Sequence, residues 1–442
     1  MSYSNPAVDR IEASFKELTQ DVNRTSAATR NGWVFFLALH AYFFVALAGI
    51  THQDLLLNKP VALPILQVEI GLKSFFIFGP VILVLIHVGI LLQHVMLARQ
   101  ARDLHERVTQ FEGTGLFRSH RTRMHLHSYF FAQLIAGPNR SPFFAFFLGL
   151  MTWLSFGILP ILLLLNFQTA FLAYHDLDVT WAHRAYLVTD VLMLTIFAAF
   201  MRYPAAPFVT GFGRTISERP VSFLLSLILC VGALFFSLSV ATVPDEKMDR
   251  AMTSLMPVPV VSLTPDTRPP RQAFLLTALL FEGGVDMLSG TPAGLFGRNL
   301  VVTDAALVRD RGLAPEETSI NLRRRDLRYG TFDRSDLHQA DLTGADLTQA
   351  SLREVNLVEA KANRAVFRGA DLWRAQFIPS LSTGRPVNPM QLRGADLRGA
   401  SLQQANLMGA EMDAALFEFA DLRGAQMDTE DAAEAARQGA KF

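Results

Sequence analysis

Residues 319–357 read SINLRRRDLRYGTFDRSDLHQADLTGADLTQASLREVNL, and a large apolar side chain returns at every fifth position. The register resumes after a gap in residues 391–412, QLRGADLRGASLQQANLMGAEM. A helix of 3.6 residues per turn cannot bring every fifth residue to one face, so this period predicts short strands joined by corners and stacked into a solenoid. The recurring large residues are Leu322, Leu327, Phe332, Leu337, Leu342, Leu347, Leu352, Leu357, Phe367, Leu372, Phe377, Leu392, Leu397, Leu402, Leu407, Met412, Phe417, Leu422 and Met427.

Each unit of five also separates inward from outward positions. A small residue precedes the large one by two places, as Ala340 precedes Leu342, with a polar residue such as Asp341 between them. In extended backbone, residues two apart point to the same face, so we expect Ala340 and Leu342 inside and Asp341 outside. The two remaining residues, Thr343 and Gly344 in this unit, must then turn the chain toward the next strand.

The units ADLTG, ADLTQ, ADLRG and ANLMG resemble the consensus of the pentapeptide-repeat family: Ala, then Asp or Asn, then Leu, then two variable residues. The resemblance covers residues 320–429 and implies a right-handed quadrilateral β-helix with four units per coil. On that basis we expect about three coils over residues 322–377 and about two over 392–427. Ala362 stands where a large residue is expected, which predicts an underfilled layer or a local irregularity.

The gap in the repeat, FIPSLSTGRPVNPMQL at residues 377–392, contains three prolines that prevent regular strand pairing. We expect it to bulge from one face of the solenoid, either as a recognition loop or as an inert one. The tail DTEDAAEAARQG at residues 428–439 reads as a short helix that caps the last coil. The three prolines are Pro379, Pro386 and Pro389.

The first half of the chain has a different character. Five segments have the length and apolarity to cross a hydrocarbon layer of roughly 30 Å. Pro160, in a segment without ionisable residues, predicts a kink. Residues 1–20 alternate charges, unlike a cleavable signal peptide, so the first segment is expected to remain as an anchor. The five segments are 33–51, 74–96, 143–165, 185–203 and 221–243.

The expected architecture is multi-domain, with an α-helical transmembrane bundle followed by the β-solenoid. We divide it into an N-terminal cytoplasmic segment, a transmembrane domain, a linker without readable fold, the repeat domain and a capping tail. Cys230, the single cysteine, lies in an apolar segment, so intrachain disulfides and cysteine-based zinc sites are excluded. The corresponding ranges are 1–32, 33–243, 244–318, 319–428 and 429–442.

The arginines between the segments predict the orientation, because positively charged loops are retained in the cytoplasm. The loop after segment 74–96 is rich in arginine, whereas the loop before it offers only Lys59 and Lys73. We therefore expect a multi-pass protein of the bacterial inner membrane with a cytoplasmic N-terminus and a periplasmic solenoid. Failure of one segment to span would reverse the solenoid's side, as would re-entry of AFLLTALLF at residues 273–281. The arginines of that loop are Arg99, Arg102, Arg107, Arg118, Arg121, Arg123 and Arg140.

Residues 50–80, ITHQDLLLNKPVALPILQVEIGLKSFFIFGP, look like the first external loop of bacterial membrane-anchored pentapeptide-repeat proteins. This resemblance brings no known activity with it. It agrees with an external position for the loop between the first two apolar segments.

A few ionisable residues lie inside the apolar segments, where they are costly and often functional. His40 and His87 are candidates for a bis-histidine haem site, which requires two imidazoles on facing helices. The alternative is that neutral histidines, His94 included, form hydrogen bonds across the bundle. Asp190 then pairs with a histidine or faces the headgroups. We expect no resident metal or cofactor.

The solenoid carries nearly equal numbers of basic and acidic residues, which makes an acidic imitation of DNA improbable. Arg323, Arg324 and Arg325 form the most distinctive basic cluster, and Arg385 lies in the insertion. These four are the candidate binding residues for an anion or an acidic partner. The opposing interpretation is a solvated first coil whose arginines pair with its own aspartates.

No nucleophile elbow, phosphate loop or HExxH motif is present, so we predict no catalytic residue and no enzymatic activity. The leading hypothesis is a non-enzymatic membrane scaffold whose solenoid binds a protein or an envelope component. The alternative is a membrane transport or haem-linked redox protein regulated by the solenoid. The expected partners are the lipid bilayer and a protein, a second copy of the chain being one candidate, and not nucleic acid.

Overall fold

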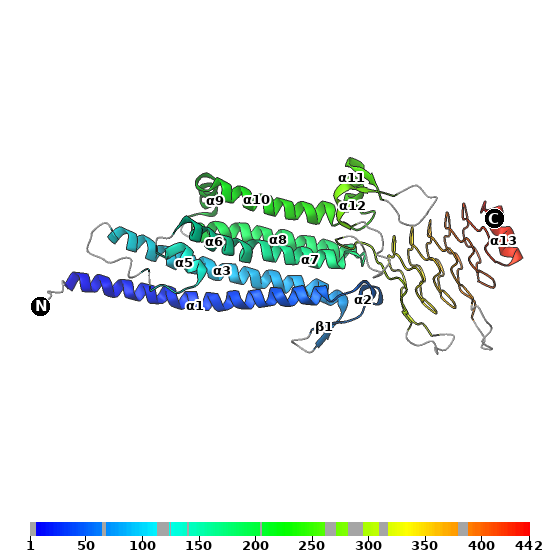
Figure 1. The fold of residues 1–442 in the computed structure, drawn as a ribbon, viewed down its shortest axis with the longest axis horizontal. Coiled ribbons are helices and arrows are strands. Elements are labelled where there is room, and N and C mark those ends of the chain that lie inside the picture. Colours follow the sequence, from blue (N-terminus) through cyan, green and yellow to red (C-terminus); the bar gives the residue numbers. More distant parts are fainter. Residues whose placement is uncertain are drawn as a thin grey trace. The chain divides into compact units, whose positions relative to one another are not determined.

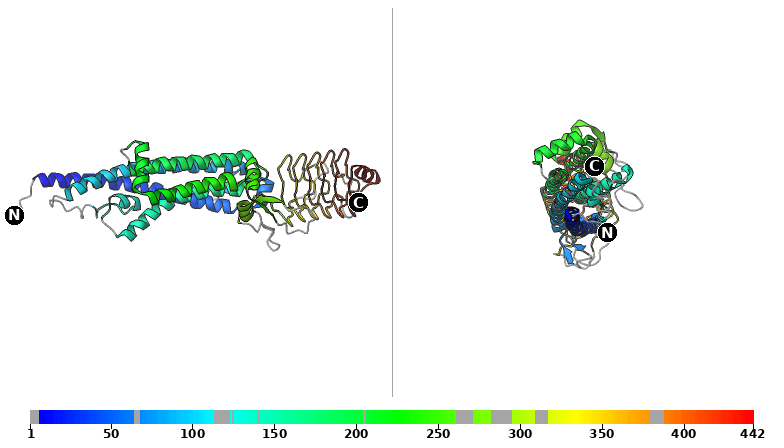
Figure 2. Two further views of the ribbon diagram at one scale, coloured as in Figure 1. Left: turned by 90° about the horizontal axis from the view of Figure 1, so that it is seen from above. Right: turned by 90° about the vertical axis from the view of Figure 1, so that its left-hand side faces the viewer.

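The computed structural model divides the chain into two compact units (Figures 1 and 2). The helical unit comprises Met1–Gly49, Ser74–Phe167 and Trp181–Ser237. The solenoid unit comprises Ile50–Lys73, Gln168–Thr180 and Leu238–Phe442, so it contains loops from the first half of the chain as well as the repeat. The structure describes residues 6–63, 68–112, 123, 125–138, 141–203, 206–260, 271–281, 295–308, 317–378 and 388–442.

Five long helical stretches among the described residues are apolar enough to cross a membrane, as the sequence predicts. The first two extend well beyond their apolar cores, because the flanking polar sequence contains no helix breaker. Figure 1 shows α1, α3, α8 and α10 running side by side. The five stretches are α1 (Pro6–Ala48), α3 (Leu72–Glu112), α6 (Pro142–Trp153) with α7 (Leu159–Leu172), α8 (Leu177–Arg202) and α10 (Pro220–Phe235).

The distortion expected at Pro160 takes the form of a π-helical turn. Between α6 and α7 the chain forms η1 (Leu154–Ile158), which ends two residues before the proline. Proline has no N–H to donate to the preceding turn, and a wider turn accommodates the carbonyl that is left free. A second π turn, η2 (Phe236–Val240), follows α10.

Aromatic side chains fill the core of the helical unit. Phe167 is fully buried, and its ring lies 5.3 Å from that of Phe43 and 5.6 Å from that of Phe75. A Cβ atom at Gly79 would come within 2.9 Å of Phe167 Cζ, so glycine is needed for α3 to approach this ring. Two shorter helices complete the unit, α5 (Phe130–Ala136) and α9 (Phe208–Glu218).

The repeat forms a β-helix whose coils contain twenty residues. The Leu322 N–H donates to the Asp341 carbonyl at 2.8 Å, and parallel bridges join Asn321 to Asp341 and Asp326 to Asp346. Twenty residues are four five-residue units, so residues 321–377 make three coils and residues 391–427 make two, as expected. The bridges across the insertion span thirty residues instead, for example Lys361 to Gln391.

The predicted inward positions are confirmed, but Asp341, expected to face outward, is buried, because its carboxylate folds back to accept the Thr343 N–H of the corner. Ala345 and Leu347 are fully buried, whereas Thr343, at the corner of the preceding unit, is partly exposed. The underfilled position Ala362 is also buried, and its N–H donates to the Gln391 carbonyl at 2.7 Å. Backbone pairing therefore continues through this layer without interruption.

The corners explain two further features of the repeat. The Asp341 carboxylate accepts a hydrogen bond from the Thr343 N–H at 3.0 Å, which stabilises the turn that follows each strand. The last residue of the unit then adopts a left-handed conformation, with φ of 67° at Gly344 and 60° at Gln349. The recurring aspartates are thus structural residues of the coil.

The ends of the solenoid are covered. The predicted capping helix is α13 (Thr429–Arg437), after which the Lys441 N–H donates to the Ala420 carbonyl at 2.8 Å. At the other end, Val301 pairs with Thr331 and adds a partial coil that the five-residue period does not reveal. Pro379, Pro386 and most of the insertion lie outside the described residues.

The segments before the partial coil are short. In the chain's first half they are α2 (His52–Leu57) and the antiparallel strands β1 (Val61–Leu63) and β2 (Val68–Ile70). The stretch expected only to link the domains contains α11 (Lys247–Leu255), the antiparallel strands β3 (Pro257–Pro259) and β4 (Gln272–Phe274), and α12 (Leu275–Phe281). At seven residues, α12 is too short to cross a membrane.

Candidate functional site

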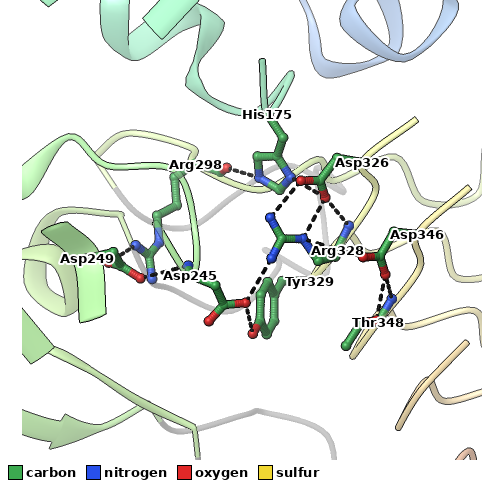
Figure 3. Close-up of polar contacts among 9 residues, drawn as sticks. All are labelled: His175, Asp245, Asp249, Arg298, Asp326, Arg328, Tyr329, Asp346 and Thr348. Atoms are coloured by element: carbon green, nitrogen blue, oxygen red, sulfur yellow. Dashed lines mark hydrogen bonds and ion pairs between the residues drawn. The ribbon is translucent and has the colours of Figure 1, made fainter. Parts of the chain in front are cut away.

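A cluster of charged and polar residues joins the first coil to the turn between α7 and α8 within the solenoid unit (Figure 3). His175 lies in this turn with a left-handed backbone, φ 59°. Its Nε2 atom donates to the Arg298 carbonyl at 2.8 Å, and its Nδ1 atom lies 3.3 Å from Asp326 Oδ1. The imidazole therefore connects this turn with the first coil.

Arg328 is the centre of the cluster. Its guanidinium binds Asp326 through two hydrogen bonds, of 2.9 Å from Nε and 2.7 Å from Nη2. The third nitrogen, Nη1, donates to Asp245 at 3.1 Å, and the Tyr329 hydroxyl donates to the same carboxylate at 2.7 Å. Such forked arginine–carboxylate pairs are geometrically specific, so they fix the orientation of the first coil against residue 245.

The titration properties follow from these contacts. Burial alone would raise the pKa of the Asp326 carboxyl, but hydrogen bonds from His175 and Arg328 outweigh it and hold this pKa well below its ordinary value. The hydrogen bond to Asp326 raises the pKa of Arg328. Burial raises the pKa of Tyr329 to about 12, and its hydrogen bond to Asp245 acts in the same direction. At neutral pH the Asp326 carboxyl is therefore ionised, Arg328 is positively charged and the Tyr329 hydroxyl is neutral.

A buried ion pair lies next to the cluster. Arg298 is fully buried, and its Nη1 atom donates to Asp249 at 2.8 Å. The same carboxylate accepts hydrogen bonds from the Thr242 hydroxyl at 3.1 Å and from the Asp245 N–H at 3.0 Å. The loop that carries Asp245 is therefore held in place by α11.

Arg323, Arg324 and Arg325 do not share one environment. Arg323 is exposed and lies 3.4 Å from Asp341, and Arg324 is exposed as well. Arg325 instead donates to the Leu56 carbonyl at 3.3 Å and places its guanidinium 3.9 Å from the centre of the Tyr174 ring. The triplet thus presents two arginines to solvent and uses the third inside the unit. Arg385 lies outside the described residues.

His40 and His87 both lie in the core of the helical unit. His87 Nδ1 is 2.6 Å from Asp190 Oδ1, and His40 Nδ1 bonds to the Phe36 carbonyl at 2.8 Å. The Phe36 ring contacts both imidazoles, with centroids 4.2 Å from His40 and 5.3 Å from His87. One iron bound by both histidines would require Phe36 to leave the core, so the packing does not fit a haem. The predicted pairing of Asp190 with a histidine is confirmed.

Other buried histidines also bond across the helical unit, as the alternative to haem binding predicts. His94 Nε2 lies 2.6 Å from the Tyr129 hydroxyl, and His183 Nε2 donates to the Phe76 carbonyl at 2.7 Å. Such bonds satisfy imidazoles that are excluded from water.

A second surface feature was not singled out from the sequence. Trp373 is partly exposed on the third coil, with its ring centre 4.8 Å from the guanidinium carbon of Arg353 and 4.3 Å from that of Arg374. Arg353 comes from one coil earlier, twenty residues away, which places it beside Trp373. The Trp373 N–H donates to Asp371 at 3.1 Å, and Arg374 donates to Gln404 at 2.7 Å.

The coil period of twenty residues is the feature of the sequence from which this arginine–tryptophan–arginine triad could have been predicted. A tryptophan at an outward variable position is unusual in a repeat of small and charged residues. With four units per coil, Arg353 falls directly next to it. The triad combines the three properties of an interaction surface: a large aromatic ring, two adjacent charges and a rigid backbone.

Comparison with known proteins identifies the repeat. The family described as "Pentapeptide repeats (8 copies)" matches residues 318–354, 345–378 and 391–427. A solved pentapeptide-repeat protein from Nostoc PCC 7120 is 31% identical over 25% of this chain and 83% of its own, with a TM-score of 0.21. This chain belongs to the pentapeptide-repeat family.

Two further pentapeptide-repeat structures are similar to the chain. Rfr23 from the cyanobacterium Cyanothece 51142 is 28% identical over 24% of this chain, with a TM-score of 0.19, and the chain spans 63% of its length. A protein of the Arabidopsis thaliana thylakoid lumen is 21% identical over 30% of this chain and 87% of its own, with a TM-score of 0.18. Comparison with curated proteins gives no match.

Proposed function

We propose that this pentapeptide-repeat protein is a non-enzymatic membrane scaffold whose solenoid binds a partner protein through the triad Arg353, Trp373 and Arg374. The observation that carries the proposal is the partly exposed tryptophan between two guanidinium groups on a rigid coil. Tryptophan and arginine dominate the binding energy of protein interfaces. A ring already held in place loses little conformational freedom on binding, so the triad is prepared for contact.

The neighbouring charges support this choice of surface. Arg368 and Arg398 both bind Asp396 with hydrogen bonds of 2.6 and 2.8 Å, and Arg423 binds Asp421 at 2.6 Å. Arginines that are paired in this way are largely compensated by their own carboxylates. Arg353 also lies 3.8 Å from Asp371, but the triad differs because its two guanidinium groups flank an aromatic ring and leave part of the ring open to a partner.

Photo-crosslinking in intact membranes tests the proposal. A benzophenone amino acid at position 373 of the full chain should give a defined adduct with a partner protein. The matched control places the same group at Gln376, which is exposed on the next face of the same coil. Arg353→Ala should weaken the adduct at position 373, because it removes one side of the triad. Equal adducts at both positions, or none at 373, would contradict the proposal.

The same proposal places the protein in the bacterial inner membrane, with the N-terminus in the cytoplasm and a right-handed solenoid in the periplasm. Five apolar helices support a multi-pass anchor, and the arginine distribution supports the orientation. Alkaline phosphatase fused after residue 442 should be active, whereas a fusion near Arg118 should be inactive. An inactive C-terminal fusion with full-length expression would place the solenoid in the cytoplasm.

A further inference from the structure

The helical unit contains a large cavity that the scaffold function does not use. Its volume is about 960 Å³, at the upper end of the roughly 300–1,000 Å³ that holds small ligands. Side chains from α3, α5, α6, α8, α9 and α10 line it. Most of the lining is apolar and aromatic, including Phe131, Phe146, Leu194, Phe223 and Leu227.

One part of the lining is strongly basic. Arg102 of α3, Arg202 at the end of α8 and Arg219 before α10 all border the cavity. The Arg102 Nε atom donates to the Met201 carbonyl at 3.4 Å, so α3 meets the end of α8 here. Arg202 is near enough to Arg102 and to Arg219 for its charge to interact with each of them.

The carboxylates near these arginines do not balance them. Glu106 borders the cavity, and Glu218 lies close to Arg202. Glu218 also accepts a hydrogen bond from the Tyr203 hydroxyl. Among the residues that the structure describes, three guanidinium groups therefore face two carboxylates, one of which is engaged with a tyrosine. An anion placed among the arginines would relieve their mutual repulsion.

The position of the arginines in the helices indicates the kind of anion. Arg202 and Arg219 lie at the ends of membrane-spanning helices, where lipid headgroups meet water. Between them, α9 carries apolar side chains that are exposed, such as Val209 and Ile216, next to polar ones, such as Arg214 and Glu218. Amphipathic helices of this kind lie in the membrane interface. Figures 1 and 2 show α9 lying across the direction of α10.

From this arrangement we infer that the cavity binds an anionic phospholipid, with the phosphate held by Arg102, Arg202 and Arg219 and the acyl chains in the apolar part. Arginine binds phosphate through paired hydrogen bonds, and basic pockets between membrane helices bind anionic headgroups. A free phosphate would satisfy the arginines alone. Only a lipid also fills the aromatic and aliphatic lining between α5 and α10.

Native mass spectrometry of the full chain, purified in detergent and exchanged into vesicles, tests the inference. With equal phosphatidylglycerol and phosphatidylcholine, we expect phosphatidylglycerol to be retained on the order of 10- to 100-fold more, since each arginine contributes several-fold. Replacing Arg102, Arg202 and Arg219 together by glutamine should abolish this preference. The matched control replaces Arg24, Arg30 and Arg107, which are exposed and do not border the cavity.

A second pair of variants keeps the test informative if the arginine variant fails to fold. Gly149 borders the cavity, and a Cβ atom there would meet nothing within 4 Å, so Gly149→Leu fills the cavity without removing a charge. Gly89→Leu in α3 is the control, because it also meets nothing but does not border the cavity. Lipid retention should fall at least several-fold in Gly149→Leu and stay unchanged in Gly89→Leu.

Three outcomes would overturn the inference. Equal retention of the two lipids by the unaltered protein would remove the preference for an anion. Displacement of phosphatidylglycerol by millimolar inorganic phosphate would assign the arginines to a soluble anion. Equal loss of lipid in the cavity and control variants would show that retention reflects the general surface of the helices.

Discussion

The helical unit and the solenoid unit encode their interiors in different ways. In the solenoid, the N–H of each strand bonds to a carbonyl one coil away, and position in the five-residue unit decides which side chain is buried. In the helical unit, backbone bonds are satisfied within each helix, and burial depends on which helices meet. The effect of a substitution is therefore readable from the sequence in one unit and requires the three-dimensional structure in the other.

The largest effect should come from breaking the inward column of the solenoid. Ala345 is fully buried, so Ala345→Arg places a guanidinium without a partner in the core, at a cost of several kcal/mol. Domains are typically stable by only about 5–15 kcal/mol, so we expect the solenoid of the full chain to lose protease resistance. Limited proteolysis, followed through a C-terminal tag, measures this.

Thr343→Arg is the matched control two residues away, where the side chain is partly exposed. Surface substitutions usually change stability by within about 0.5 kcal/mol, so this variant should stay resistant. The reverse result would invert the inside and outside of the repeat. Resistance of both variants would mean that the inward column tolerates much larger side chains than its packing indicates.

The next largest effect should come from the charged cluster of the first coil. Asp326→Asn leaves Arg328 without its forked partner and weakens the contact to His175, which should destabilise the solenoid unit by about 2–3 kcal/mol. Urea unfolding monitored by pulse proteolysis measures the change. Asp346→Asn, whose carboxylate lies 3.8 Å from the Arg328 Nε atom, is the control and should change stability much less.

Asp326 also predicts the pH dependence of this unit. Because its pKa is lowered in the folded state, the unfolded chain binds more protons as the pH falls through about 4. The stabilisation is thus complete at neutral pH and is lost progressively on acidification below that value. Asp326→Asn should flatten this part of the stability profile. If the variant lost stability on acidification as much as the unaltered protein, other carboxylates would dominate the pH dependence of the unit.

In the helical unit, the corresponding test is the pair of His87 and Asp190. Asp190→Asn removes one carboxyl oxygen from a pair joined by a hydrogen bond of 2.6 Å that is excluded from water, and we expect a loss of about 1–2 kcal/mol, as for other polar contacts between membrane helices. Thermal unfolding in detergent measures it. Asp178→Asn, at the exposed start of α8, is the control. Equal effects would mean that burial of the pair contributes nothing.

The solenoid unit could be predicted from the sequence in more detail than the helical unit. The period of five predicted the coil, its four units, and the burial of Ala345 and Leu347, because each depends on neighbours at a constant distance along the chain. Hydropathy and segment length together predicted the five apolar helices. It did not predict that Phe36 would lie against both His40 and His87, because helix packing depends on contacts between distant segments.

The same limit applied to the candidate sites. Trp373 was overlooked because its partner Arg353 is adjacent only after the chain completes a coil. The partial coil at Val301 was overlooked because the residues before it do not repeat. The cavity arginines Arg102, Arg202 and Arg219 come from three separate parts of the chain, and the sequence presents Arg102 only as one of the loop arginines that orient the protein.

The smallest expected effects separate three consecutive arginines that look equivalent in the sequence. Arg325 contacts the Tyr174 ring and the Leu56 carbonyl, so Arg325→Gln should destabilise the solenoid unit by about 1 kcal/mol. Arg323→Gln removes only a 3.4 Å contact between an exposed guanidinium and Asp341, and should cost less than about 0.5 kcal/mol.

Arg324→Gln is the internal reference, because its side chain is exposed and its φ of 54° is accepted equally by glutamine at Gln339 and Gln349. Urea unfolding of the three variants under one condition ranks their free energies of unfolding. Because all three remove one positive charge from the same coil, long-range electrostatics is nearly matched among them, and the difference reports the contacts of Arg325. Equal stability of the three variants would mean that the contacts to Tyr174 and Leu56 add nothing to the first coil. The triplet would then act as a single solvated patch, as its spacing in the sequence suggests.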